Sequence, residues 1–190
     1  MKKTFIFKIL LLTLFILGCN SKNRSKLEDK GAELEKTTTK KEPKVFESDF
    51  FEFDLSFTDF NHAKTQFGTI TFNEDGDFES VNNLSNTIEI GRLPKMTEQE
   101  RTEFIISLYP TGDDTYEEIK STQIQNTVIG NYNANILDTP YVFDNVEGIM
   151  YFVILDGEEW SLAFTGRAFG DGKQDLLEKY KKTVKSIRLK

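Results

Sequence analysis

Apolar and polar residues alternate along much of the chain after residue 45, and this period of two predicts β-strands. The first alternating segment places four apolar side chains on one face of a half-buried strand, namely Phe51, Phe53, Leu55 and Phe57. Residues 65–83 predict two strands joined by a tight turn at Asp75-Gly76, and residues 87–93 predict another strand. These segments indicate a sheet built from hairpins.

Two further hairpins are predicted in the second half of the chain. Residues 115–139 read as two strands with a turn near Gly130-Asn131. Residues 146–169 form the clearest hairpin pattern, an apolar strand followed by Asp156-Gly157 and a second strand rich in aromatic side chains. The second strand alternates large apolar residues with smaller ones, so we expect it to lie in the sheet.

The period changes to that of a helix after residue 96. Thr97 and Glu100 have the spacing of a capping box, in which each residue satisfies a backbone N–H of the other. A short helix is supported by Arg101, Phe104, Ile105 and Leu108. Pro110 and Gly112 are expected to end it.

A second helix is predicted near the C-terminus. Asp171 is expected to cap it, with Gln174 completing a second capping box. Its apolar stripe consists of Leu177, Tyr180, Val184 and Ile187. The last residues, 186–189, predict a short edge strand.

Hairpins and two helices together predict the α+β class, an antiparallel β-sheet of several hairpins with two helices packed on it. From residue 87 onward, the element order, the aromatic hairpin, the amphipathic helix and the closing Lys-Ser-Ile resemble the superfamily of PsbP-like lumenal proteins and Ran-binding Mog-type proteins. The resemblance implies an α/β/α sandwich, and many of its members are binding or assembly proteins without catalysis. It identifies no functional residue in this sequence.

The first 19 residues have the layout of a bacterial export signal: lysines at positions 2, 3 and 8, then an apolar run over residues 9–17. The run is shorter than the roughly 20 residues that span a bilayer. Residues 16–19, Ile-Leu-Gly-Cys, resemble the lipobox of bacterial lipoproteins. This resemblance implies cleavage before Cys19, a diacylglycerol on its sulfur and an acyl chain such as palmitate on its new amine. The alternative is an ordinary signal in which a buried or free cysteine occurs by chance.

Three regions follow from these observations: a signal peptide (residues 1–18), a lipidated cysteine with a flexible tether (19–44) and one α+β domain (45–190). The tether is predicted because this segment is polar and lacks aromatic residues, so it cannot bury enough apolar surface to fold. By analogy with other lipoproteins, Asn20 and the basic residues after it favour the outer membrane, facing the periplasm.

Charge narrows the range of partners. The formal net charge of the chain is -7, and residues 1–18 and 20–44 each carry +3, which leaves -13 for residues 45–190. An acidic domain of this kind argues against nucleic-acid binding.

Candidate chemistry is sparse. The one histidine, His62, lies among polar residues and is interpreted as a surface or turn residue. The best candidates for metal ligands are two acidic groups, Asp75, Asp77 and Glu79 in one and Asp171 and Asp175 in the other. Neither has the spacing of a calcium loop, and a turn and a helix cap explain them better. We therefore predict no metal, no cofactor and no catalytic residue.

The expected function is that of a membrane-anchored envelope lipoprotein whose acidic domain binds an envelope protein or a small ligand without catalysis. The bilayer is the expected partner of acylated Cys19, and the sequence does not indicate the residues that bind the other partner. Two alternatives stay open. One is a toxin-neutralising lipoprotein of the immunity type, and the other is a hydrolase that uses scattered carboxylates.

Overall fold

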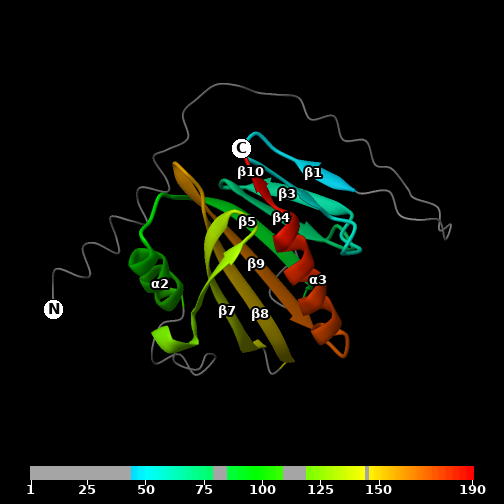
Figure 1. The fold of residues 1–190 in the computed structure, drawn as a ribbon. Helices are drawn as coiled ribbons and strands as arrows, with labels where there is room; N and C mark the ends of the chain where they lie inside the picture. The colour runs from blue at the N-terminus through cyan, green and yellow to red at the C-terminus, as the bar shows by residue number, and fades with distance from the viewer. Residues whose placement is uncertain (1–43, 79–84, 109–118, 144–145) are drawn as a thin grey trace. The chain divides into compact units, whose positions relative to one another are not determined.

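The computed structural model describes residues 44–78, 85–108, 119–143 and 146–190. Within these ranges seven strands form an antiparallel sheet (Figure 1). In spatial order the strands are β3 (His62–Gln66), β4 (Thr69–Asn73), β5 (Thr87–Pro94), β9 (Trp160–Phe169), β8 (Val146–Asp156), β7 (Tyr132–Phe143) and β6 (Gln125–Ile129). The sheet therefore has β3 and β6 at its edges and the long β8–β9 hairpin near its centre.

A second, smaller sheet contains β1 (Val45–Glu47), β2 (Phe51–Asp54) and β10 (Arg188–Leu189), in the order β1-β2-β10. Phe51 and Phe53 are buried while the residues between and after them are half-buried, which confirms the alternation predicted for this strand. Phe57 is half-buried beyond the end of β2. The predicted C-terminal edge strand is confirmed by β10, which pairs antiparallel with β2.

The first predicted helix is α2 (Glu98–Ser107), and it begins as its sequence predicts. The N–H of Glu100 donates to the hydroxyl of Thr97 at 3.3 Å, and the N–H of Thr97 donates to the carboxylate of Glu100 at 2.8 Å. This capping box satisfies two backbone donors that the first turn would otherwise leave unpaired. A short 3-10 turn, η1 (Ser121–Gln123), precedes β6.

The second helix, α3 (Lys173–Ser186), begins one residue too late for the predicted cap. Its N-cap is Gly172, without a side-chain cap, and Asp171 is exposed. The prediction that Asp171 caps the helix is therefore wrong. The backbone of Gly170, at φ 78°, turns the chain just before the helix, so that Asp171 stands outside the capping position.

The predicted turn at Asp75-Gly76 is also wrong. The β3–β4 hairpin turns at Phe67-Gly68, where both residues have positive φ, 50° and 80°. Every residue of β3 is exposed, so its sequence carries no apolar alternation that would have marked the strand. Asp75 and Gly76 follow β4, and the return strand predicted there falls partly on residues 79–84, outside the described ranges. The other two predicted turns are confirmed at Gly130-Asn131 and after Asp156.

The two faces of the large sheet are covered by different elements. Because successive strand residues point to opposite faces, β8 contributes Val153 to one apolar cluster and Ile154 to another. The first cluster contains residues of α3 and β2, and the second contains Ile105 of α2. The domain thus belongs to the α+β class, with helices packed on an antiparallel sheet.

Helix α3 packs tightly against the sheet at Gly166 of β9. A Cβ atom at this position would lie 2.4 Å from the ring of Tyr180, whose hydroxyl donates to the carbonyl oxygen of Arg167 at 2.6 Å. No side chain larger than hydrogen fits between the strand and this ring. A Cβ atom at Gly91, on neighbouring β5, would lie 3.4 Å from the hydroxyl oxygen of Thr69, which is an ordinary contact distance.

We expect Gly166→Ala to lower the free energy of unfolding by about 1–3 kcal/mol, because overpacking would displace the Tyr180 ring and α3. Urea unfolding followed by circular dichroism measures this change. Gly91→Ala is the matched control and should leave stability within about 0.5 kcal/mol of the wild type. Equal effects of the two substitutions would contradict the proposed packing role of Gly166.

A second measurable property of this core is the ionisation of Tyr151. The side chain is buried, and burial, followed by the charges of Asp138 and Glu178, raises its pKa from 10.0 to about 12. In the unfolded chain the phenol ionises near 10. Between these two values the unfolded state binds fewer protons than the folded state, so stability falls as pH rises.

We therefore expect the free energy of unfolding to fall by about 2–3 kcal/mol between pH 10 and 12 because of Tyr151. Urea unfolding at a series of alkaline pH values, with tyrosinate absorbance as a second signal, measures the slope. Tyr151→Phe should reduce it and leave the contribution of Tyr180, whose pKa burial also raises. An unchanged slope in Tyr151→Phe would disprove this assignment.

Candidate functional site

Within the part of the chain that the structure describes, the residues that the sequence singles out do not come together in one site. Cys19 and Glu79 lie outside the described residues. Asp75 and Asp77 lie in the loop after β4, where the N–H of Asp77 donates to the Asp75 carboxylate at 3.1 Å. The described residues contain no group of three or more His, Cys, Asp or Glu side chains that could hold a metal ion.

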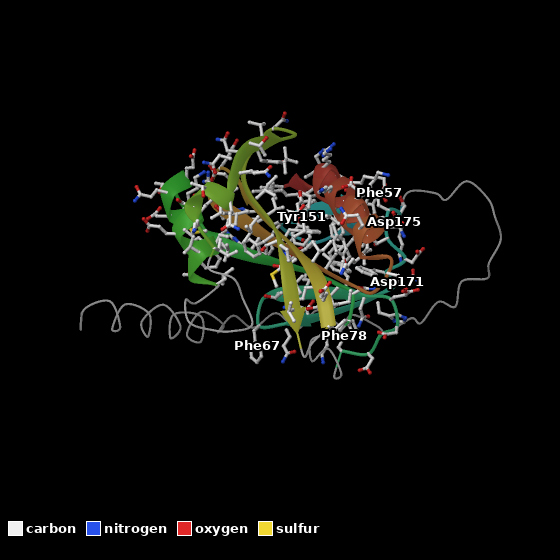
Figure 2. All side chains as sticks on the ribbon, turned by 90° about the horizontal axis from the view of Figure 1, so that it is seen from below. Phe57, Phe67, Phe78, Tyr151, Asp171 and Asp175 are labelled. Carbon is white, nitrogen blue, oxygen red and sulfur yellow. The ribbon has the colours of Figure 1, made fainter. Side chains whose placement is uncertain are left out.

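His62 is exposed on edge strand β3 and lies beside Gly76. Asp171 and Asp175 are exposed, and Figure 2 shows both side chains at the surface around the start of α3. Asp175 lines a cavity of about 300 Å³, to which Asp59 also contributes. Lys179 also lines this cavity. Its ammonium group lies 3.5 Å from the Asp59 carboxylate and offsets part of the negative charge of the cavity.

The strongest polar cluster centres instead on Arg101 of α2, whose side chain is only 3% exposed. Its guanidinium lies 3.1 Å from the carboxylate of Asp156 at the end of β8. It also donates to the carbonyl oxygen of Met96 at 2.8 Å and to the side-chain oxygen of Asn135 at 2.6 Å. Lys95 donates to the other oxygen of the Asp156 carboxylate at 2.6 Å. A single carboxylate therefore faces two cations.

The polar network continues from Asn135 along the same face of the sheet. The amide nitrogen of Asn135 donates to Asn126 at 2.7 Å and to the hydroxyl of Thr102 at 3.1 Å. Asn126 in turn donates to the carboxylate of Glu98 at 2.7 Å. These bonds connect the first turns of α2 to β6, β7 and β8. Since α2 buries few apolar residues, the network contributes much of its attachment to the sheet.

A cleft of about 340 Å³ opens beside this network. It is lined by Lys95, Met96, Thr97, Glu98, Glu100, Arg101, Asn133 and Asp156. Both of its cations are already paired with Asp156. Its side chains can bind polar groups by hydrogen bonds, and they include no hydroxyl or thiol nucleophile paired with a histidine. The geometry is that of a structural anchor beside a polar cleft.

The sequence pattern indicates Arg101 only as one of the residues that support a short helix. The signal for its role is that a charged residue occupies the stripe at position 101, three and four residues before Phe104 and Ile105. A charge on the buried face of a helix requires a buried partner. Asp156, which the sequence indicates only as a turn residue, is that partner.

A second surface feature lies across the β8–β9 turn from the cleft. The guanidinium of Arg92 lies 4.7 Å from the ring centre of Phe50 and 5.1 Å from that of Trp160. The two rings meet edge to face at 6.2 Å. We call Phe50, Arg92 and Trp160 the aromatic cluster. Phe50 is 43% exposed, so the cluster presents an apolar ring and a cation to solvent.

Comparisons with known proteins bear on the fold alone. No protein-family model and no curated protein matches the sequence. Among solved structures, the chain is similar to a protein of Bacteroides thetaiotaomicron VPI-5482, with a TM-score of 0.50 and 7% identity. The similar region covers 74% of this chain and 45% of that one, so this chain matches less than half of its neighbour's length. At this identity the likeness concerns the arrangement of helices and strands.

We expect Asp156→Ala to lower the free energy of unfolding by about 3–5 kcal/mol, because it leaves the buried Arg101 guanidinium without its carboxylate. Urea unfolding measures the change. Lys95→Ala is the control: its side chain is 46% exposed, and its pair with Asp156 should contribute at most about 1 kcal/mol. The double variant Arg101→Met, Asp156→Leu should recover much of the loss, because no buried charge remains unpaired. A mild effect of Asp156→Ala would contradict the anchoring role.

Proposed function

We propose that this protein is a lipid-anchored lipoprotein of the bacterial envelope, and that its acidic domain binds a partner protein without catalysing a reaction. The observation that carries the proposal is the sequence Ile-Leu-Gly-Cys at residues 16–19, which follows a basic start and an apolar run. The acyl chains on Cys19 supply the anchor, since two or more chains hold a protein firmly on a bilayer. No helix within the described residues is long and apolar enough to cross a membrane.

Residues 20–44 form the tether in this proposal. A flexible chain of about 25 residues has a typical span of roughly 25–30 Å. Lys44, at its end, donates to Asn61 at 2.8 Å, and this contact supports placing the start of the domain there. The domain therefore works close to the membrane, and we propose the outer membrane, on the periplasmic side.

A binding role is supported by the aromatic cluster. Aromatic residues and arginine are enriched among the residues that contribute most to protein–protein binding. Phe50 and Arg92 are presented over Trp160, which holds both in place. The formal charge of -13 on residues 45–190 favours a basic partner, because opposite charge speeds association.

We also propose that the domain is an α/β/α sandwich related to the PsbP-like and Mog-type superfamily. The support is that α2 and α3 contribute to separate apolar clusters, built from alternate residues of the same strands. Such a fold provides a rigid sheet whose edges and turns are free to bind partners.

Replacement of Cys19 tests the anchor. In cells that carry out lipoprotein processing and are supplied with labelled palmitate, the wild type should become labelled and sediment with membranes. Cys19→Ala should lose the label, because no thiol remains to accept the diacylglycerol. Ser21→Ala is the matched control and should be labelled like the wild type. The label is the decisive signal, since an uncleaved signal peptide could also hold the variant in the membrane. Labelled Cys19→Ala protein would refute the proposal.

A further inference from the structure

Phe67 stands out among the described residues. It is the one residue there, other than glycine, with positive φ, at 50°. Its side chain is 93% exposed, and Figure 2 shows it at the periphery of the domain, outside the packed core. A bulky L-residue is unfavourable in this conformation, and a two-residue turn of this type normally carries Asn-Gly. At 93% exposure the ring buries little apolar surface against the domain.

Among the described residues, no strand pairs with the outer edge of the strand that leads into this turn. β3 is the outermost strand beside β4, and all five of its residues are exposed. A two-residue turn makes Gln66 and Thr69 a hydrogen-bonded pair, so Thr65 and Ala63 direct their backbone groups away from β4. Natural edge strands are usually protected by charge, proline or a bulge. β3 carries one charge, Lys64, and no proline.

The register places this edge next to the aromatic cluster. Thr69 pairs with Gly91, and Arg92 is the next residue of β5 toward the same end of the sheet. Two residues further, Pro94 pairs with Trp160. Phe67, Arg92 and Trp160 therefore lie at the same end of neighbouring strands. An open backbone edge, an exposed ring and a cation are thus available to one partner.

We propose that β3 and Phe67 form a docking edge at which an extended segment of another envelope protein adds as an eighth strand. The backbone of the added strand bonds to Ala63 and Thr65, and Phe67 packs against one of its apolar side chains. This proposal rests on the proposed binding function and names the site that performs it. The segment that pairs with β3 is extended and largely uncharged, with at most an acidic side chain opposite Lys64, and the basic residues that the acidic domain favours lie elsewhere on the same partner.

Nearby charges favour a protein over a lipid surface as the partner that binds at β3 and Phe67. Glu158 and Glu159 are exposed in the β8–β9 turn, at the same end of the sheet as Phe67. A bilayer with anionic lipids would repel these carboxylates as the ring approached it. A protein strand that binds along β3 need not approach the β8–β9 turn, which is separated from β3 by β4 and β5.

The test uses the full chain in the cells that make it, with the photoreactive residue benzoylphenylalanine in place of Phe67. Irradiation should yield one discrete adduct with a different protein, and an adduct between two copies of this chain would contradict the proposal. The same probe at Val128 is the control, because Val128 is 63% exposed on the other edge strand, β6. Thr65→Pro, combined with the probe at position 67, should abolish the adduct, because proline blocks an outward N–H without breaking the bonds to β4.

A second variant separates binding from folding. Phe67→Asn restores the Asn-Gly pair that this turn favours, so thermal stability should hold or rise. The adduct partner, once identified and purified, should bind Phe67→Asn at least about tenfold more weakly than the wild-type full chain. A loss of affinity in a variant that is no less stable cannot be attributed to misfolding.

Several outcomes would overturn the proposal. They are adducts with lipid alone, an adduct that Thr65→Pro leaves unchanged, equal adducts at positions 67 and 128, and unchanged affinity of Phe67→Asn. The Cys19 labelling experiment is independent of all of these. A position-67 adduct in a chain that accepts no palmitate would support the docking edge and contradict the lipid anchor. A palmitate-labelled chain without this adduct would support the lipid anchor and contradict the docking edge.

Discussion

The architecture depends on the burial of the β8–β9 hairpin on both faces. Strands at the centre of the sheet direct apolar side chains toward both faces, such as Val153 and Leu155 toward one face and Ile154 toward the other. Each face needs a cover, because burial of apolar surface is the main source of stability. Helix α3 and the small sheet cover one face, and α2 covers the other. The position of almost every other element follows from this requirement.

The two covers are attached by different kinds of interaction. α3 is held by apolar packing that tolerates no gap, as the contact between Gly166 and Tyr180 shows. α2 is held largely by polar bonds around Arg101 and Asp156. A buried ion pair contributes little net stability compared with apolar packing, but it imposes one geometry, because any other leaves a charge unpaired. The polar attachment therefore fixes where α2 lies, and with it the cleft beside its first turn.

Much of the fold could be predicted from the pattern of residues. Strong period-two segments, such as Phe51–Asp54 and Trp160–Phe169, and the Thr97–Glu100 capping box became the expected elements, because local pattern and burial agree there. The predictions were wrong or incomplete where the local sequence pattern and the burial of the residues do not agree. β3 is exposed on both faces and has no alternation, so the turn at Phe67-Gly68 went unrecognised. Arg101 could not be assigned its role, because its partner Asp156 lies 55 residues away and only the folded sheet brings them together.

The last strand has a consequence for how the molecule folds. β10 comprises residues 188 and 189, and it pairs with β2 near the start of the domain. The N–H of Leu189 also donates to the hydroxyl of Tyr132 at 2.9 Å. The small sheet therefore joins two segments that lie far apart in the sequence, since Arg188 pairs with Glu52. A pairing between such distant residues must close a long loop before it gains any contacts, so we expect the small sheet to form late in folding.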